Sequence, residues 1–202
     1  MPVPKMKKTT PTDPVNEFLE KGNRRFVKAA LRHPRRSPRH RRLLTRGQRP
    51  QAAILCCADS RVVPEIIFDC GLGDLFAVRV AGAVADAAGI GSLEYAVEHL
   101  HVPLVLVLGH SRCGAVQAAL AGEKAHGCLG SVLRAIQPAI RQAAGYASGD
   151  PLTQAIKANV RHTIATLLAS SPLLSQSCRQ GTLAIRGAYY DFHSGRVEPI
   201  DN

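Results

Sequence analysis

The chain has 202 residues, of which 46% are hydrophobic and 20% are charged, and its formal net charge is +11. This length and composition fit one soluble globular domain with a substantial core, and no stretch approaches the roughly twenty apolar residues that a membrane helix requires. The basic N-terminus lacks the apolar segment of a secretory signal, and six cysteines are too few for a small disulfide-rich secreted protein. We therefore expect a cytoplasmic protein that does not act at a membrane.

The N-terminal region is expected to form an arm. Residues 1–12 carry Pro, Thr and Lys without periodicity, and we expect them to be disordered. Asp13 and Pro14 suit the N-cap and first turn of a helix, and apolar residues at helical spacing predict an amphipathic helix over residues 14–30. Because a stretch rich in Pro and Arg follows this helix, we expect residues 13–46 to pack on a partner subunit.

Residues 32–46 contain seven arginines and no acidic residue, and removing these seven charges from +11 leaves +4. Such a run could bind nucleic acid or another anionic surface. It could equally be a solvated linker, or an arm that clasps an acidic partner subunit. No aromatic residue interleaves the arginines, which argues against base stacking. We favour the second interpretation and do not expect a nucleic-acid partner.

From Gln51 onward, strand-like and helix-like segments alternate. The predicted helices cover residues 63–69, 92–101, 114–121, 130–144 and 151–170, with a loop at 81–91. The predicted strands cover residues 52–56, 75–80, 103–108 and 182–190. The unbroken apolar run of 103–108 indicates a strand that is buried on both sheet faces. This alternation predicts an α/β fold with a mostly parallel central β-sheet flanked by helices, preceded by the N-terminal helical arm.

Two short polar clusters each follow a predicted strand directly. The first is Cys57-Ala58-Asp59-Ser60-Arg61, and the second is His110-Ser111-Arg112-Cys113. In open α/β sheets, ligands bind beyond the carboxyl ends of the strands. If the two strands are neighbours, Cys57 and His110 emerge side by side, and one loop presents both His110 and Cys113. The clusters are therefore expected to form one site.

The residue types of this site predict a metal. Two thiolates and an imidazole are ligands that suit zinc, and three protein ligands leave a fourth position open, as in catalytic zinc sites. A bidentate pair with Arg61 could hold Asp59 off the metal. Alternatively, Asp59 could be the fourth ligand of a closed site, and the sequence leaves both arrangements open. We interpret residues 47–202 as a zinc-binding catalytic domain with one Zn²⁺ per subunit.

At these clusters the chain resembles the β-class carbonic anhydrases, whose motifs are C-x-D-S-R and H-x-x-C. Further similarities in family order lie at residues 22–26, 47–48, 73–76, 91–95 and 187–190. The resemblance implies zinc held by Cys57, His110 and Cys113, with Asp59 and Arg61 as a catalytic dyad. It implies reversible hydration of CO₂ to bicarbonate and a proton by attack of a zinc-bound hydroxide.

The resemblance also implies a substrate pocket and an assembly. By matching position, the pocket would be lined by Gln48, Phe76, Tyr95 and Gly114. Family members are dimers or larger, with the N-terminal helix embracing a neighbour, so a homodimer or tetramer is expected.

Two other functions stay open at this point. One is a hydrolase for a CO₂-like molecule, CS₂ or COS, on the same fold. The other is a structural zinc protein with a nucleic-acid-binding basic arm, in which Asp59 would be a permanent fourth ligand.

Overall fold

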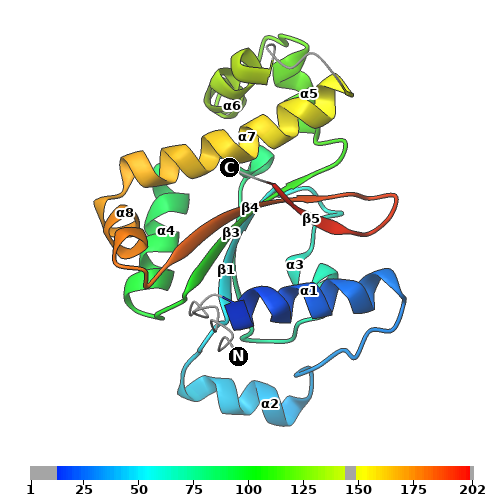
Figure 1. Cartoon of the computed structure of the whole chain (residues 1–202), viewed down its shortest axis with the longest axis vertical. Helices are drawn as coiled ribbons and strands as arrows, with labels where there is room; N and C mark the ends of the chain where they lie inside the picture. Colours follow the sequence, from blue (N-terminus) through cyan, green and yellow to red (C-terminus); the bar gives the residue numbers. More distant parts are fainter. Residues whose placement is uncertain (1–12, 144–148, 201–202) are drawn as a thin grey trace, which may run out of the picture.

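The structure is a computed structural model that describes residues 13–143 and 149–200, so the disorder expected for residues 1–12 lies outside the described residues. Its core is one five-stranded sheet in the order β2-β1-β3-β4-β5 (Figure 1). The first four strands are parallel and the last pairs antiparallel with β4. The strands are β1 (Ala52–Cys56), β2 (Leu75–Arg79), β3 (Leu104–His110), β4 (Ala184–Tyr190) and β5 (Val197–Ile200). The prediction of a mostly parallel α/β fold is confirmed.

Helices cover both faces of the sheet (Figure 1). α1 (Asp13–Val27) and α3 (Pro64–Ile67) lie on one face, and α4 (Ala87–Glu98) and α7 (Pro151–Ser170) lie on the other. Because side chains alternate along a strand, Leu55 and Cys57 belong to one buried cluster and Cys56 to the opposite one. All seven residues of β3 are buried, as the apolar run of this segment predicts.

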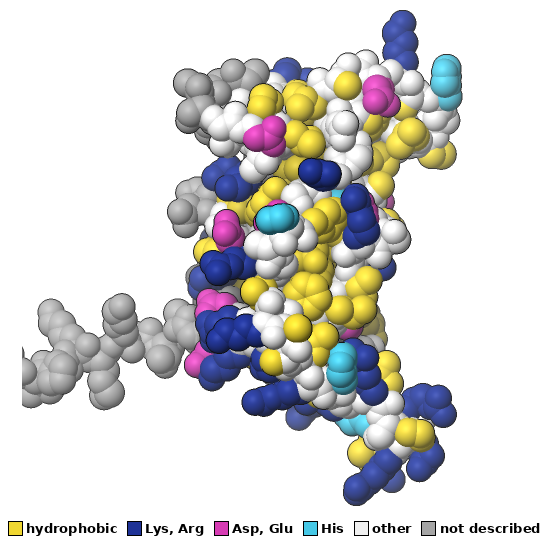
Figure 2. All heavy atoms as spheres, turned by 90° about the vertical axis from the view of Figure 1, so that its right-hand side faces the viewer, with side chains coloured by type: hydrophobic (Ala, Val, Ile, Leu, Met, Phe, Trp, Pro, Cys, Tyr) yellow, Lys and Arg dark blue, Asp and Glu magenta, His cyan; other side chains and the backbone are white. Residues whose placement is uncertain are grey.

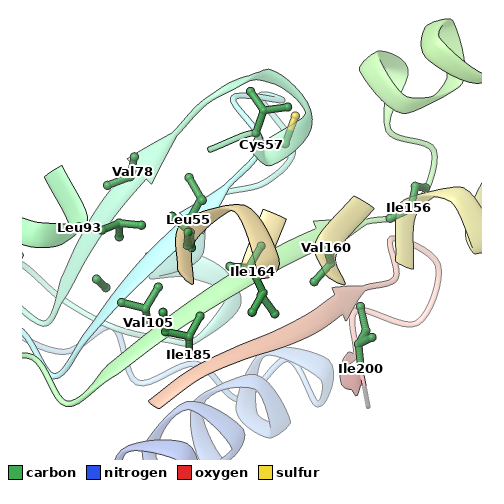
Figure 3. Close-up of a cluster of buried hydrophobic side chains, with 14 of the residues drawn as sticks. Leu55, Cys57, Val78, Leu93, Val105, Ile156, Val160, Ile164, Ile185 and Ile200 are labelled. Carbon is green, nitrogen blue, oxygen red and sulfur yellow. The ribbon is translucent and has the colours of Figure 1, made fainter. Parts of the chain in front are cut away.

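α7 is the principal cover of the sheet on its side. Figure 3 shows Ile156, Val160 and Ile164 of this helix over the strands, in the cluster that also contains Cys57. A Cβ atom at Gly109 would lie 2.7 Å from Val160 Cγ2. The glycine before His110 therefore permits the close approach of α7 to β3. The remaining helices of this layer are α5 (Gly114–Leu120), α6 (Leu129–Ala143) and α8 (Pro172–Arg179).

The structure corrects several boundaries. α4 begins at Ala87 because the Asp86 carboxylate accepts a hydrogen bond from Gly89 N at 2.6 Å, so the loop predicted at 81–91 is wrong in its second half. Its first half holds the 3₁₀ turn η2 (Ala81–Ala83). α2 (Pro38–Leu43), a following 3₁₀ turn η1 (Leu44–Arg46), α8 and β5 were not predicted. Apart from α8, these elements have three to six residues, too few to show a period.

The N-terminal helix packs on the sheet of its own chain. Val15 and Leu19 are buried in the same cluster as Phe68, and a Cβ atom at Gly22 would lie 1.8 Å from the carbonyl oxygen of Phe68. The Asn23 side chain accepts a hydrogen bond from Val197 N and donates one to Gly195 O, each at 2.9 Å. α1 therefore packs on the sheet of its own chain, and its contact with a partner subunit stays a prediction.

Two carboxylates, those of Asp69 and Asp74, hold the basic segment of residues 32–46. Asp69 accepts hydrogen bonds from Arg25 Nε and from the backbone N–H groups of Arg32 and His33, and Asp74 pairs with Arg35. The other arginines from 36 to 49 are exposed and form no ion pair with the described part of the chain. Figure 2 shows Lys and Arg side chains gathered at the lower end of the molecule, where Figure 1 places α2. The segment is thus an ordered, strongly basic surface.

Candidate metal centre

The carboxyl ends of β1 and β3 place the two polar clusters together. These strands are parallel neighbours with Cys56 opposite Leu108, so Cys57 directly after β1 and His110 at the end of β3 reach the same edge of the sheet. Cys113 is the residue that precedes α5. The ligand atoms of Cys57, His110 and Cys113 all lie within 4.8 Å of one another, and all three residues are buried. The convergence predicted from the sequence is confirmed.

The orientation of His110 fits a metal ligand. Its Nδ1 lies 2.9 Å from the carbonyl oxygen of Ser111, an arrangement that assigns the ring proton to Nδ1 and leaves a lone pair on Nε2. Nε2 is buried and has no hydrogen-bond partner among the described residues. A buried polar atom without a partner is costly, and coordination of a cation by this lone pair would satisfy it.

The environment of the two cysteines also fits a metal. A hydrogen bond from the Cys113 thiol, together with bonds from nearby backbone N–H groups, lowers the pKa of Cys57. The N–H groups belong to Asp59 and Gly82, at 3.4 and 3.3 Å from Cys57 Sγ. The neighbouring Cys57 sulfur and burial raise the pKa of Cys113. As ligands of one cation both cysteines would be thiolates, and two thiolates with one imidazole form a donor set that suits Zn²⁺.

Asp59 lies beside this cluster in a bidentate pair with Arg61. Arg61 Nε donates to Asp59 Oδ1 at 2.9 Å and Nη2 donates to Oδ2 at 2.7 Å, while the Arg61 backbone N–H adds a bond of 3.0 Å. The hydrogen bonds from the guanidinium hold the pKa of the Asp59 carboxyl well below its usual range. The carboxylate therefore stays ionised and directed toward Arg61, outside the set of three ligand atoms.

Several supporting residues were not found from the sequence. Arg79 Nη2 donates to the carbonyl oxygen of Asp59 at 2.8 Å, and Asn159 Nδ2 of α7 donates to that of Gly82 at 2.7 Å. These bonds hold the two residues, Asp59 and Gly82, whose backbone N–H groups donate to Cys57 Sγ. The one available signal was Asn159, a polar residue spaced three and four residues from the apolar Ile156 and Ala155 on one face of its helix. Arg79 gave none, because an arginine at the end of a strand is usually a surface residue.

Of the four predicted pocket residues, Gly114 is next to a metal ligand in the chain, and the other three lie elsewhere in the fold. Gly114 directly follows Cys113 as the first residue of α5. Phe76 lies in β2 opposite Ala53, near the other end of the strands, with its ring 6.2 Å from that of Tyr95, which is 47% exposed. Gln48 is exposed in the segment before β1. None of the four lines the small cavity at the metal-ligand cluster in the described chain, and their substrate role stays a prediction.

Comparisons with known proteins agree with this geometry. A family model described as carbonic anhydrase matches residues 52–197. Carbonic anhydrase 2 of Mycobacterium tuberculosis is 45% identical over 191 residues, covering 92% of either chain. A carbonic anhydrase of Mycolicibacterium smegmatis is 43% identical over 186 residues, covering 89% of either chain.

Solved structures show the same fold. The β-carbonic anhydrase CafA of Aspergillus fumigatus superposes with a TM-score of 0.73 at 27% identity, covering 94% of this chain and 91% of that one. A tetrameric β-carbonic anhydrase of Sordaria macrospora gives a TM-score of 0.74 at 22% identity, covering 94% and 98%. Among the described residues no helix has the length and apolarity needed to cross a membrane. With its buried triad of two cysteines and a histidine, the chain belongs to the β-class carbonic anhydrase family.

Proposed function

We propose that this chain catalyses the reversible hydration of CO₂ to bicarbonate and a proton, with one zinc ion per subunit. One observation carries the proposal. Three buried ligand atoms, from Cys57, His110 and Cys113, lie within 4.8 Å of one another, and the Nε2 atom of His110 has no other partner in the described chain. This set binds zinc and leaves a fourth position open.

The residues around the triad have separate roles in this reaction. When bound, zinc supplies the Lewis acid that makes water a nucleophile near neutral pH. The Asp59 carboxylate, ionised and fixed by Arg61, accepts a hydrogen bond from the reacting water and orients it toward CO₂. Arg61 keeps Asp59 from becoming a fourth ligand, which would close the site.

A second copy of the chain would complete the substrate pocket. Within one subunit, Gln48, Phe76 and Tyr95 lie away from the triad, and Tyr95 and Gln48 are exposed. If they line the pocket as predicted, they do so at the triad of a neighbouring subunit, while Gly114 stays beside its own Cys113. We therefore propose a homodimer or tetramer, in line with the relative described as tetrameric. A cytoplasmic location suits the six cysteines, which are all free thiols.

The decisive experiment compares three substrates on one preparation of measured zinc content. Stopped-flow assays from about pH 7 to 9, the range in which zinc-bound water ionises, would follow CO₂ hydration and, separately, COS and CS₂ hydrolysis. We expect rapid turnover of CO₂. Turnover of COS or CS₂ without CO₂ hydration would favour the hydrolase, and fully metallated protein without any turnover would favour a structural zinc site.

A further inference from the structure

Phe192 contacts both the Asp59–Arg61 pair and the metal-ligand triad. It follows β4 in the turn that leads to β5, and its ring lies 4.4 Å from Arg61 Cζ, measured to the ring centroid. The same ring lies 5.1 Å from the imidazole of His110, with 33° between the planes. One aromatic side chain therefore contacts the arginine that holds Asp59 and a histidine of the metal-ligand triad.

The ring of Phe192 is itself fixed from several sides. Tyr190 packs against it edge-on, with centroids 5.4 Å apart and 79° between the planes. The backbone N–H of Phe192 donates to Ser111 Oγ at 2.8 Å. This bond ties the β4–β5 turn to the loop between His110 and Cys113. On the far side, Asn23 of α1 hydrogen-bonds the backbone of the same turn. The turn is thus a rigid support for the ring.

Arg61 needs such a support because it is exposed. Its side chain is 54% accessible, while that of Asp59 is 16% accessible. Ion pairs between exposed side chains are weak and are screened by salt, so the two hydrogen bonds to Asp59 give limited control over the guanidinium. A planar guanidinium that also stacks on an aromatic face loses much of its remaining freedom.

We propose that Phe192 is a positioning residue for carbonic anhydrase activity. Its ring holds the Arg61 guanidinium in the orientation that donates two hydrogen bonds to the Asp59 carboxylate. The same ring keeps the Asp59–Arg61 pair next to the His110 imidazole. The inference rests on the proposed role of Asp59 and Arg61, and its test separates failure of one from failure of the other. Leucine at position 192 would fill similar space but offers no face for a cation.

The first readout is the Arg61 side chain itself. In ¹⁵N-labelled zinc-loaded protein, the Arg61 Nε–H signal, identified by its loss in Arg61→Lys, should be shifted upfield by the ring below it and should exchange slowly with water. Phe192→Leu should move this signal downfield and speed its exchange, whereas Phe192→Tyr, which keeps the aromatic face, should leave it near its original position. An Arg61 Nε–H signal that has the same position and exchange rate in the unmodified protein, Phe192→Leu and Phe192→Tyr would overturn the proposal.

The second readout is CO₂ hydration by the same samples at measured zinc content. We expect Phe192→Leu to lower kcat about fivefold with full zinc, the scale of a cation–π contact at an exposed site, and Phe192→Tyr to recover most of it. Phe18→Leu makes the same change at a half-buried phenylalanine of α1 and should leave kcat unchanged. Equal losses in Phe192→Leu and Phe192→Tyr would mean that the ring only fills space. If the unmodified protein lacks hydration activity, the proposed function fails, while the Arg61 signal still decides whether Phe192 positions it.

Discussion

Asp59 and Arg61 differ in exposure although two side-chain hydrogen bonds join them. Asp59 lies against the metal-ligand cluster, and its carbonyl oxygen is held by Arg79. Arg61 lies toward solvent on the ring of Phe192. Asp59 is thus fixed through its backbone, and the direction of its carboxylate oxygens depends on an exposed partner.

We expect Arg61→Ala to retain zinc and to lose CO₂ hydration about 100-fold, because Asp59 would no longer be oriented toward the reacting water. Zinc content by atomic absorption and stopped-flow hydration measure the two effects separately. Arg179→Ala is the matched control, since Arg179 is an exposed arginine of α8 and belongs to neither polar cluster. Hydration that is unaffected in zinc-replete Arg61→Ala would show that the role assigned to the pair is wrong.

At the scale of elements, one of the contacts that hold α1 is a close approach of its backbone to Phe68. A Cβ atom at Gly22 would lie 1.8 Å from the Phe68 carbonyl oxygen, whereas one at Gly91, an exposed position within α4, would meet nothing within 4 Å. We expect Gly22→Ala to lower the free energy of unfolding by about 3 kcal/mol through overpacking. Gly91→Ala should raise it by up to about 1 kcal/mol through helix propensity. Urea unfolding of both variants is the measurement, and shifts of the same sign would refute the packing described for α1.

The attachment of the basic segment should depend on pH through Asp69. Burial alone would raise the pKa of this carboxyl, but the hydrogen bonds from Arg25 and from the backbone N–H groups of Arg32 and His33 lower it below its ordinary value. A carboxylate with a depressed pKa contributes stability above its unfolded pKa of about 3.9. That stability is lost as the pH falls through the folded pKa.

Asp69→Asn should therefore cost about 2 kcal/mol at pH 7, and its difference from the unmodified protein should shrink below about pH 4. Urea unfolding from about pH 7 to 3 would measure this. Glu123→Gln is the control, because Glu123 is an exposed carboxylate with no ion pair among the described residues. A cost for Asp69→Asn that is independent of pH would exclude the charge as its cause.

The elements that could be predicted are those whose sequence carries its own periodicity. β1 is an apolar run and β3 is apolar up to His110, and because parallel neighbours end at one edge, Cys57 and His110 could be brought together from the sequence. Phe192 could not, because its contact with Arg61 depends on the turn between β4 and the short, unpredicted β5. The same holds for Asp69, whose bonds reach 37 residues back along the chain to Arg32.

For the whole molecule, the metal-ligand cluster joins elements that are distant in sequence. Its ligands come from the end of β1, the end of β3 and the start of α5, and α7 and the β4–β5 turn support them from two sides. The basic surface around α2 lies apart from these supports (Figures 1 and 2). Hydration activity should therefore follow occupancy of this one site.

Titration of metal-free protein with zinc, followed by stopped-flow CO₂ hydration, tests this claim most directly. The account predicts that the hydration rate rises in proportion to added zinc and stops rising at one zinc per chain. His110→Ala should bind less zinc and show no such break. Full zinc occupancy without CO₂ hydration, or hydration that does not follow zinc, would contradict the account.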